Sequence, residues 1–123
     1  MTAATDPRIR TAVVLDGSAG WPEVVDAPTV DRPVLLLASS GTPLHPSWSQ
    51  IRDAGLARVT IGEAGHYSAT DLCSFGASAE LCGTVSAARA IAVSRSVVDA
   101  WLDRSLRDTD APRFTAPELS WQL

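Results

Sequence analysis

The sequence has no lysine, and all ten of its basic residues are arginines. Schiff-base catalysis, a pyridoxal-phosphate anchor and a phosphate-binding P-loop each need a lysine amine, so all three are excluded. Basic charge is also scarce overall, because the net charge is −4. Nucleic acid is therefore disfavoured as a partner, since binding its phosphates requires a basic patch.

Long apolar runs are missing as well. No run approaches the ~18–20 residues that cross a bilayer, and the first ten residues, MTAATDPRIR, lack the apolar segment of a secretory signal. We therefore expect a cytoplasmic protein with no membrane span. A true start further upstream that carried a signal peptide would instead make the protein secreted.

Cysteine is limited to Cys73 and Cys82, without a CxxC or His-rich spacing. A metal site is thus not expected, and nothing in the chain calls for a cofactor. We expect the two thiols to be reduced, because disulfides are uncommon in the cytosol. The alternative is one local disulfide that closes a short loop.

The residues that are present suit one globular α/β domain. The chain has 123 residues, of which 46% are hydrophobic and 20% charged, enough for a modest core. Continuous apolar runs at 11–15 and 33–39 fit parallel strands that are buried on both faces, and 57–61 is the candidate for a third, so about three parallel strands are expected. A helix is expected between the last two, from Pro46 to Gly55, which gives a strand–helix–strand unit.

The C-terminal third predicts one long helix at 85–107, followed by an extended, Pro-broken tail. Ile91, Val98, Trp101 and Leu102 recur at helical spacing, which indicates a core-facing stripe. In the tail we expect packing anchors, namely Phe114, Leu119 and Trp121.

Two chemically useful side chains directly follow predicted strands. Asp16 follows the first strand and His66 the third, within the stretch EAGHYSATDL. Sites in open α/β sheets gather at the carboxyl ends of the strands, so these two side chains are expected on one edge. A carboxylate there can orient an imidazole and leave its second nitrogen free as a base. Asp16 and His66 are therefore the candidate catalytic residues.

Three segments, DPRIRTAVVLDGSAGWP, RPVLLLASSG and VTIGEAGHYSATDL, carry a family resemblance across nearly the whole chain. Their order resembles the C-terminal part of the platelet-activating-factor acetylhydrolase-like and actinobacterial lipase-like α/β-hydrolases. The matching positions are Asp16, Trp21, the strand 33–39, His66 and Asp71. The resemblance implies a partial α/β-hydrolase fold in which Asp16 is the acid and His66 the base of a Ser-Asp-His triad.

The family's nucleophile and oxyanion hole have no counterpart here. Only fifteen residues precede Asp16, and none forms a G-x-S-x-G elbow. Residues 1–123 are thus expected to be the C-terminal half of a hydrolase domain. Ser18, Ser39 and Ser40 are read as loop and strand-end serines that bond local backbone rather than as substitute nucleophiles.

Other polar and aromatic residues receive structural interpretations. His45 is expected to begin the helix after it, and Asp71 to cap a short helical turn. Trp21 is expected to cover the loop after Asp16.

Three functional hypotheses follow. In the first, the chain supplies the acid and base of a serine ester hydrolase that acts on a small ester, and is inactive alone. In the second, it is a free-standing pseudoenzyme or binding module. In the third, Asp16 and His66 act alone as a general base in an isomerase or cyclase; that step alone is worth only about 10²–10⁴-fold. The strand 11–15 would have an unpaired edge, so we expect it to pair with an N-terminal half-domain or with a second copy.

Overall fold

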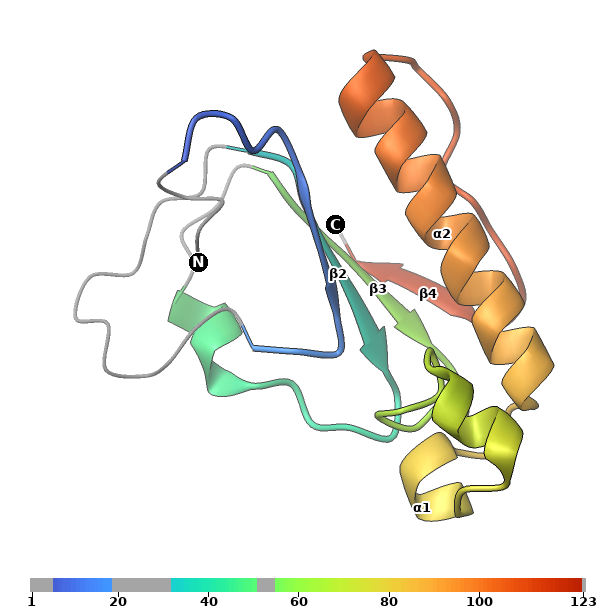
Figure 1. Ribbon diagram of the computed structural model, residues 1–123. Helices are drawn as coiled ribbons and strands as arrows, with labels where there is room; N and C mark the ends of the chain where they lie inside the picture. Colours follow the sequence, from blue (N-terminus) through green and yellow to red (C-terminus); the bar gives the residue numbers. More distant parts are fainter. Residues whose placement is uncertain (1–5, 19–31, 51–54, 123) are drawn as a thin grey trace.

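The computed structural model describes residues 6–18, 32–50 and 55–122, and these contain one four-stranded sheet. The strands lie in sequence order, and the first three are parallel, as predicted, with ends shifted by at most one residue. The bounds are β1 (Ala12–Leu15), β2 (Val34–Ser39), β3 (Leu56–Ile61) and β4 (Leu119–Gln122). Figure 1 shows the sheet between the long helix on one side and a short helical turn on the other.

The fourth strand was not predicted, since the tail was expected to be extended but unpaired. Strand β4 runs antiparallel to β3, with Val59 opposite Trp121 and Ile61 opposite Leu119. The three expected anchors, Phe114, Leu119 and Trp121, do pack against the core. The strand escaped prediction because it is short and begins two residues after Pro117, where a proline-broken tail gives no long apolar run.

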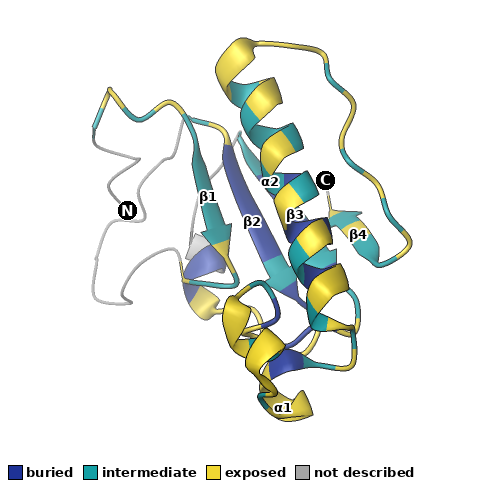
Figure 2. Cartoon of the chain, turned by 45° about the vertical axis from the view of Figure 1, so that its right-hand side comes forward, coloured by how far each residue is buried: buried dark blue, intermediate teal, exposed yellow. Residues whose placement is uncertain are grey.

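Strand β2 is the centre of the core, and its apolar run is buried on both faces as predicted. Its first four residues are at most 2% exposed. Leu35 and Leu37 pack under the long helix, whereas Val34 and Leu36 pack with Trp48 on the opposite face. In Figure 2 β2 is mostly buried, while β1 beside it contains no fully buried residue.

The long helix, α2 (Ala87–Arg107), matches the predicted helix to within two residues at its start. Ser86 begins it by accepting a hydrogen bond from the backbone N–H of Arg89, and Asp108 ends it in the left-handed conformation. The prediction for its buried face is partly wrong. Ala90, Val93, Ser94 and Val97 are buried, and Trp101 packs against the core, but Ile91, Val98 and Leu102 are only partly covered.

The width of the sheet explains why Ile91, Val98 and Leu102 are only partly covered. The buried stripe of α2 rests on the side chains of β2 and β3. A second stripe on the same helix, which includes Ile91 and Val98, extends past the edge strand β1, where the described residues provide no further strand.

The helix expected from Pro46 to Gly55 is replaced at its start by a 3₁₀ helix, η2 (Pro46–Gln50). Pro46 opens it as predicted, and His45 is its starting residue, because the backbone N–H of Trp48 donates to the His45 carbonyl at 3.1 Å. The rest of the expected helix, at 51–54, lies outside the described residues.

Between β3 and α2 the chain forms two short turns, η3 (Asp71–Phe75) and α1 (Ala79–Cys82). A disulfide joins Cys73 to Cys82, so the expectation of reduced thiols is wrong and the alternative holds. Because nine positions separate the two cysteines, the compact turns bring them within bonding range, with Cα atoms 5.7 Å apart. The cap of η3 is Thr70 rather than Asp71, which is the first residue of the turn. No helix within the described ranges is long and apolar enough to span a membrane.

Candidate active site

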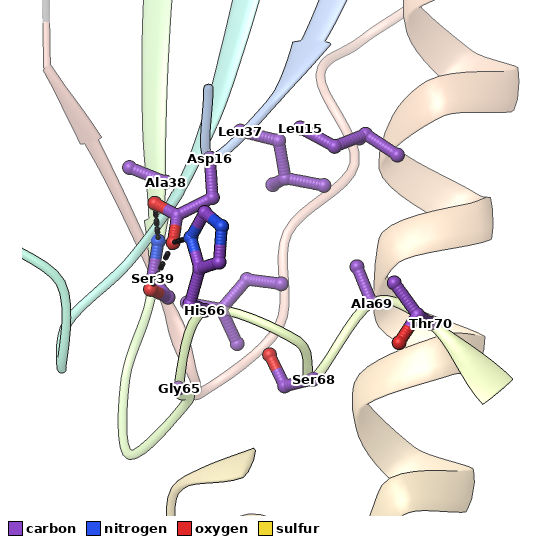
Figure 3. Close-up of a pocket in the computed structure, with 11 residues that line it drawn as sticks. Leu15, Asp16, Leu37, Ala38, Ser39, Gly65, His66, Ser68, Ala69 and Thr70 are labelled. Atoms are coloured by element: carbon purple, nitrogen blue, oxygen red, sulfur yellow. Dashed lines mark hydrogen bonds and ion pairs between the residues drawn. The ribbon is translucent and has the colours of Figure 1, made fainter. Parts of the chain in front are cut away.

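Asp16 and His66 meet at the carboxyl edge of the sheet, as their positions after β1 and β3 predict. The Nδ1 atom of His66 lies 2.9 Å from Oδ2 of Asp16, although fifty positions separate the two residues. Figure 3 shows the imidazole ring facing the carboxylate, with Ser39 on the other side of Asp16. The fold therefore joins the two candidate residues in one hydrogen bond.

Asp16 is aimed by its own backbone and by Ser39. The residue has a φ of 49°, a left-handed conformation that aspartate tolerates better than most residues do. Its Oδ1 accepts the backbone N–H of Ser39 at 2.9 Å, and its Oδ2 accepts the Ser39 hydroxyl at 2.6 Å. Behind it, the indole N–H of Trp48 donates to the carbonyl of Gly17 at 2.7 Å and holds the start of the following loop.

The role of Ser39 was missed by the sequence interpretation, which gave this serine only local backbone bonds. Ser39 is 6% exposed, and its hydroxyl also lies 2.8 Å from the hydroxyl of Thr42. The available signal was its position, because the last residue of β2 lies between the ends of β1 and β3 in a parallel sheet.

These hydrogen bonds set the ionisation of the carboxylate. Burial by itself raises the pKa of Asp16, but the hydroxyl and the backbone N–H of Ser39, followed by His66 and Thr42, lower that pKa below its usual value. The carboxylate is therefore charged at neutral pH and can only accept hydrogen bonds. It consequently requires the proton of His66 on Nδ1, which leaves the Nε2 lone pair available.

His66 sits on a loop that needs a glycine before it. A side chain on Gly65 would collide with the backbone of Leu81 and Gly83, and the adjacent Ala64 forms an isolated bridge with Gly83. Leu81 lies within the 73–82 segment that the disulfide closes, and Gly83 directly follows that segment. As a result, the loop that bears the base is packed against a covalently closed segment.

The two members of the pair differ in exposure. The imidazole of His66 is 45% exposed, whereas the Asp16 side chain is only 12% exposed. A hollow of about 270 Å³ borders both, with further walls from Leu36, Thr42 and Leu44. A base that is oriented from behind and open in front can reach a proton on an approaching group.

The remaining candidates stay outside the hydrogen-bonded pair. Ser18 and Ser40 are exposed, and the side chain of His45 bonds locally to Ser47 at 2.8 Å. Trp21, expected over the Asp16 loop, lies outside the described residues. In the part of the chain that the structure describes, no three His, Cys, Asp or Glu side chains are grouped to hold a metal ion.

Comparison with known proteins relates the chain to an esterase. No protein-family model and no curated protein matches the chain. A solved structure, the ferulic acid esterase from Streptomyces cinnamoneus, is similar with a TM-score of 0.74 and 29% sequence identity. The match covers 96% of this chain but 41% of that one, so this chain spans less than half the length of the esterase. The chain thus has an esterase-like α/β fold and is related to ester hydrolases.

Proposed function

We propose that the chain supplies the acid and the base of a Ser-Asp-His triad in a serine ester hydrolase of the lipase, acetylhydrolase or esterase type. Asp16 is the acid and His66 the base. The observation that carries the proposal is the 2.9 Å bond from His66 Nδ1 to an Asp16 carboxylate that Ser39 holds from behind. The similarity to an esterase supports the same chemistry.

In this proposal, His66 moves protons while Asp16 keeps it in position. The free Nε2 takes the proton of a serine hydroxyl as its oxygen attacks the ester carbonyl carbon, and then donates that proton to the departing alcohol oxygen. In the second half, Nε2 takes a proton from water, whose oxygen attacks the acyl-enzyme, and returns it to the serine oxygen. Asp16 stabilises the imidazolium that exists between these steps.

The serine and the oxyanion hole would come from polypeptide beyond these 123 residues, because the sequence has no G-x-S-x-G elbow. Ser39 is a poor substitute, since its hydroxyl is already committed to the Asp16 carboxylate. We therefore propose that residues 1–123 form the C-terminal half of a hydrolase domain and are inactive alone. Small esters are the proposed substrates, and a ferulic acid ester is the first to test.

The test compares the chain alone with the chain after complementation. The purified chain should hydrolyse a chromogenic short-chain ester at the blank rate and should not react with a fluorophosphonate serine probe. Co-expression with the part of the Streptomyces esterase that it does not match should restore hydrolysis. His66→Ala should then lower kcat by about 10³-fold or more, because the base is gone while any oxyanion hole remains.

Two comparisons make the result specific. Asp16→Asn should lower kcat strongly with little change in KM, since the wrong imidazole tautomer affects the chemical step. Asp103→Asn, an exposed change on α2 away from the site, should leave the rate unchanged. Ester hydrolysis by the chain alone that depends on His66 would contradict the proposed inactivity, and a complemented enzyme that tolerates His66→Ala would contradict the triad.

A further inference from the structure

A second hollow lies on the opposite side of Leu15 from the Asp16–His66 pair. This groove has a volume of about 410 Å³ and runs between the end of β1, the turn at Thr70 and Asp71, and the helix α2. In Figure 3 the Leu15 side chain extends toward α2, away from His66. We call this hollow the β1–α2 groove; its apolar walls are Leu15, Ile91 and Val98.

The apolar walls of the groove are only partly covered by the described residues. Leu15 is 49% exposed although it ends a strand whose neighbour β2 is almost completely buried. Ile91 and Val98 belong to the stripe that helical spacing marks as core-facing, yet they are only partly covered. A helix normally buries such a stripe against another element. The stripe is therefore available to a further covering element.

The floor of the groove adds a polar signal. Ser94 also lines the groove and is 6% exposed, but its hydroxyl has no hydrogen-bond partner among the described residues. Buried hydroxyls are nearly always paired, since an unpaired one costs about 1–3 kcal/mol. The groove thus offers an apolar wall and one unused hydrogen-bonding group at its base.

Continuity with the sheet identifies the kind of occupant. Strand β1 is an edge strand, so the backbone N–H and C=O groups on its outer side lack strand partners within the described residues. A polypeptide that adds a strand to this edge would pass directly beside the groove. The related esterase has more than twice the polypeptide that this chain matches, so such a segment is available in that fold.

A second copy of this chain is the alternative occupant of the same surface. An isologous contact about a twofold axis would pair β1 antiparallel with itself and bring together two grooves that each carry Asp71, Asp99 and Arg95. The length of the related esterase beyond the matched part favours a distinct polypeptide instead.

We propose that the β1–α2 groove is the docking site for the complementing segment of the hydrolase domain. This segment would be a stretch of polypeptide that places an apolar side chain against Leu15, Ile91 and Val98 and a polar group on the Ser94 hydroxyl. The proposal rests on the proposed function for the existence of a complementing segment. It adds the surface that this segment uses, which is separate from the Asp16–His66 pair.

The probe is the part of the Streptomyces esterase that the chain does not match, co-expressed with the chain as a separate polypeptide. Complex formation is measured by co-purification and by light scattering after size exclusion. Ile91→Asp and Val98→Asp should each weaken the complex by about 100-fold or more, because a charge would be buried without a partner. Ser94→Ala should weaken it by about 2- to 10-fold through one lost neutral hydrogen bond.

Leu106→Asp is the matched control, because Leu106 is 40% exposed on the same helix but lies outside the groove. It should leave the complex unchanged. In the free chain the melting temperature should fall by about 5 °C or less for Val98→Asp and should stay or rise for Ser94→Ala. This comparison separates loss of docking from loss of folding.

Three results would overturn the inference: no complex with the wild-type chain, a complex that tolerates both aspartate variants, or a homodimer that Val98→Asp dissociates. The activity readout keeps the two proposals apart. A complex that depends on Ile91 and Val98 but hydrolyses no ester supports the docking site and contradicts the triad. Hydrolysis that depends on His66 but not on Val98 supports the triad and overturns the docking site.

Discussion

The two edges of the sheet differ in how far the chain covers their apolar side chains. At the β4 edge the chain covers its own core, since Leu119 and Trp121 pack against it and the Trp121 indole N–H donates to the carbonyl of Phe114 at 3.1 Å. At the β1 edge Leu15 is 49% exposed, and Ile91 and Val98 border a groove.

The difference shows which contacts the chain supplies for itself. The contacts that orient His66 come from within the chain, namely the Asp16 carboxylate after β1, the Ser39 hydroxyl at the end of β2 and the closed segment 73–82. What is incomplete is the β1 edge, which a complementing polypeptide would cover in the proposed enzyme. We therefore expect the open edge, unlike the closed one, to gain its remaining contacts by association.

The largest expected effect separates the two stripes of α2. Val93 is 1% exposed in the shared core, so Val93→Asp would bury an unpaired charge and should cost more than about 4 kcal/mol, enough to unfold the chain. Val98→Asp, on the partly covered stripe, should lower the free energy of unfolding by only about 1 kcal/mol. Urea denaturation of both variants measures this. Equal destabilisation would mean that the groove is part of the core and the comparison of edges is mistaken.

The second effect concerns the disulfide that closes the turns beside the His66 loop. Because nine positions separate Cys73 from Cys82, its loss should lower the free energy of unfolding by about 2–3 kcal/mol. Thermal melting of the wild-type chain with and without reductant measures the change. The double variant Cys73→Ser, Cys82→Ser is the control, and it should melt like the reduced wild type and ignore reductant. Two titratable thiols in the untreated native protein would contradict the disulfide.

Elements with a local sequence signal could be predicted. Features that depend on distant parts of the fold could not. The run at 33–39 is continuous and apolar, so its burial on both faces could be read directly. Asp16 and His66 could be joined because parallel strands end on one edge. The buried face of α2 was partly misplaced because it depends on how wide the sheet is, whereas strand β4 was missed because it is short and follows Pro117.

The disulfide was also misjudged, for a different reason. The expectation of reduced thiols rested on the compartment inferred from the first residues, not on the geometry of the turns. Ser39 was missed because a strand-end serine has no pattern of its own. Only the Asp16 carboxylate beside it gives this serine a role in the site.

An intermediate effect is expected at the hydrogen bond between Ser39 and Asp16. Ser39→Ala removes a 2.6 Å hydrogen bond to the Asp16 carboxylate, which should cost about 1.5–3 kcal/mol at neutral pH. Since the folded-state pKa of Asp16 is lowered, its stabilising contribution is present above its unfolded pKa and is lost as the pH falls through the folded value. The variant should therefore begin to lose this contribution at higher pH than the wild type.

The measurement is the free energy of unfolding from about pH 7 down to about pH 2, a range that spans the titration of carboxyl groups. Asp16→Asn is the control, because it removes the titrating group and with it this part of the pH dependence. An acid transition at the same pH in the wild type and in Ser39→Ala would show that the serine does not govern the carboxylate.

The smallest effect is expected at the β4 edge, where the prediction tests which contacts hold the strand in place. Arg89 at the start of α2 donates to both carboxylate oxygens of Glu118, at 2.7 and 3.0 Å, just before β4. Both side chains are partly exposed, so Arg89→Gln should lower the melting temperature less than any change above, and the difference should vanish in about 1 M salt.

The backbone N–H of Gly62 would still donate to the Glu118 carbonyl, and Leu119 and Trp121 would still pack on the core. Hydrogen exchange of the amides from Leu119 to Gln122 provides the decisive reading. Unchanged protection means that packing closes this edge, which is the contribution that the β1–α2 groove lacks, whereas lost protection would mean that one ion pair makes the difference between the two edges.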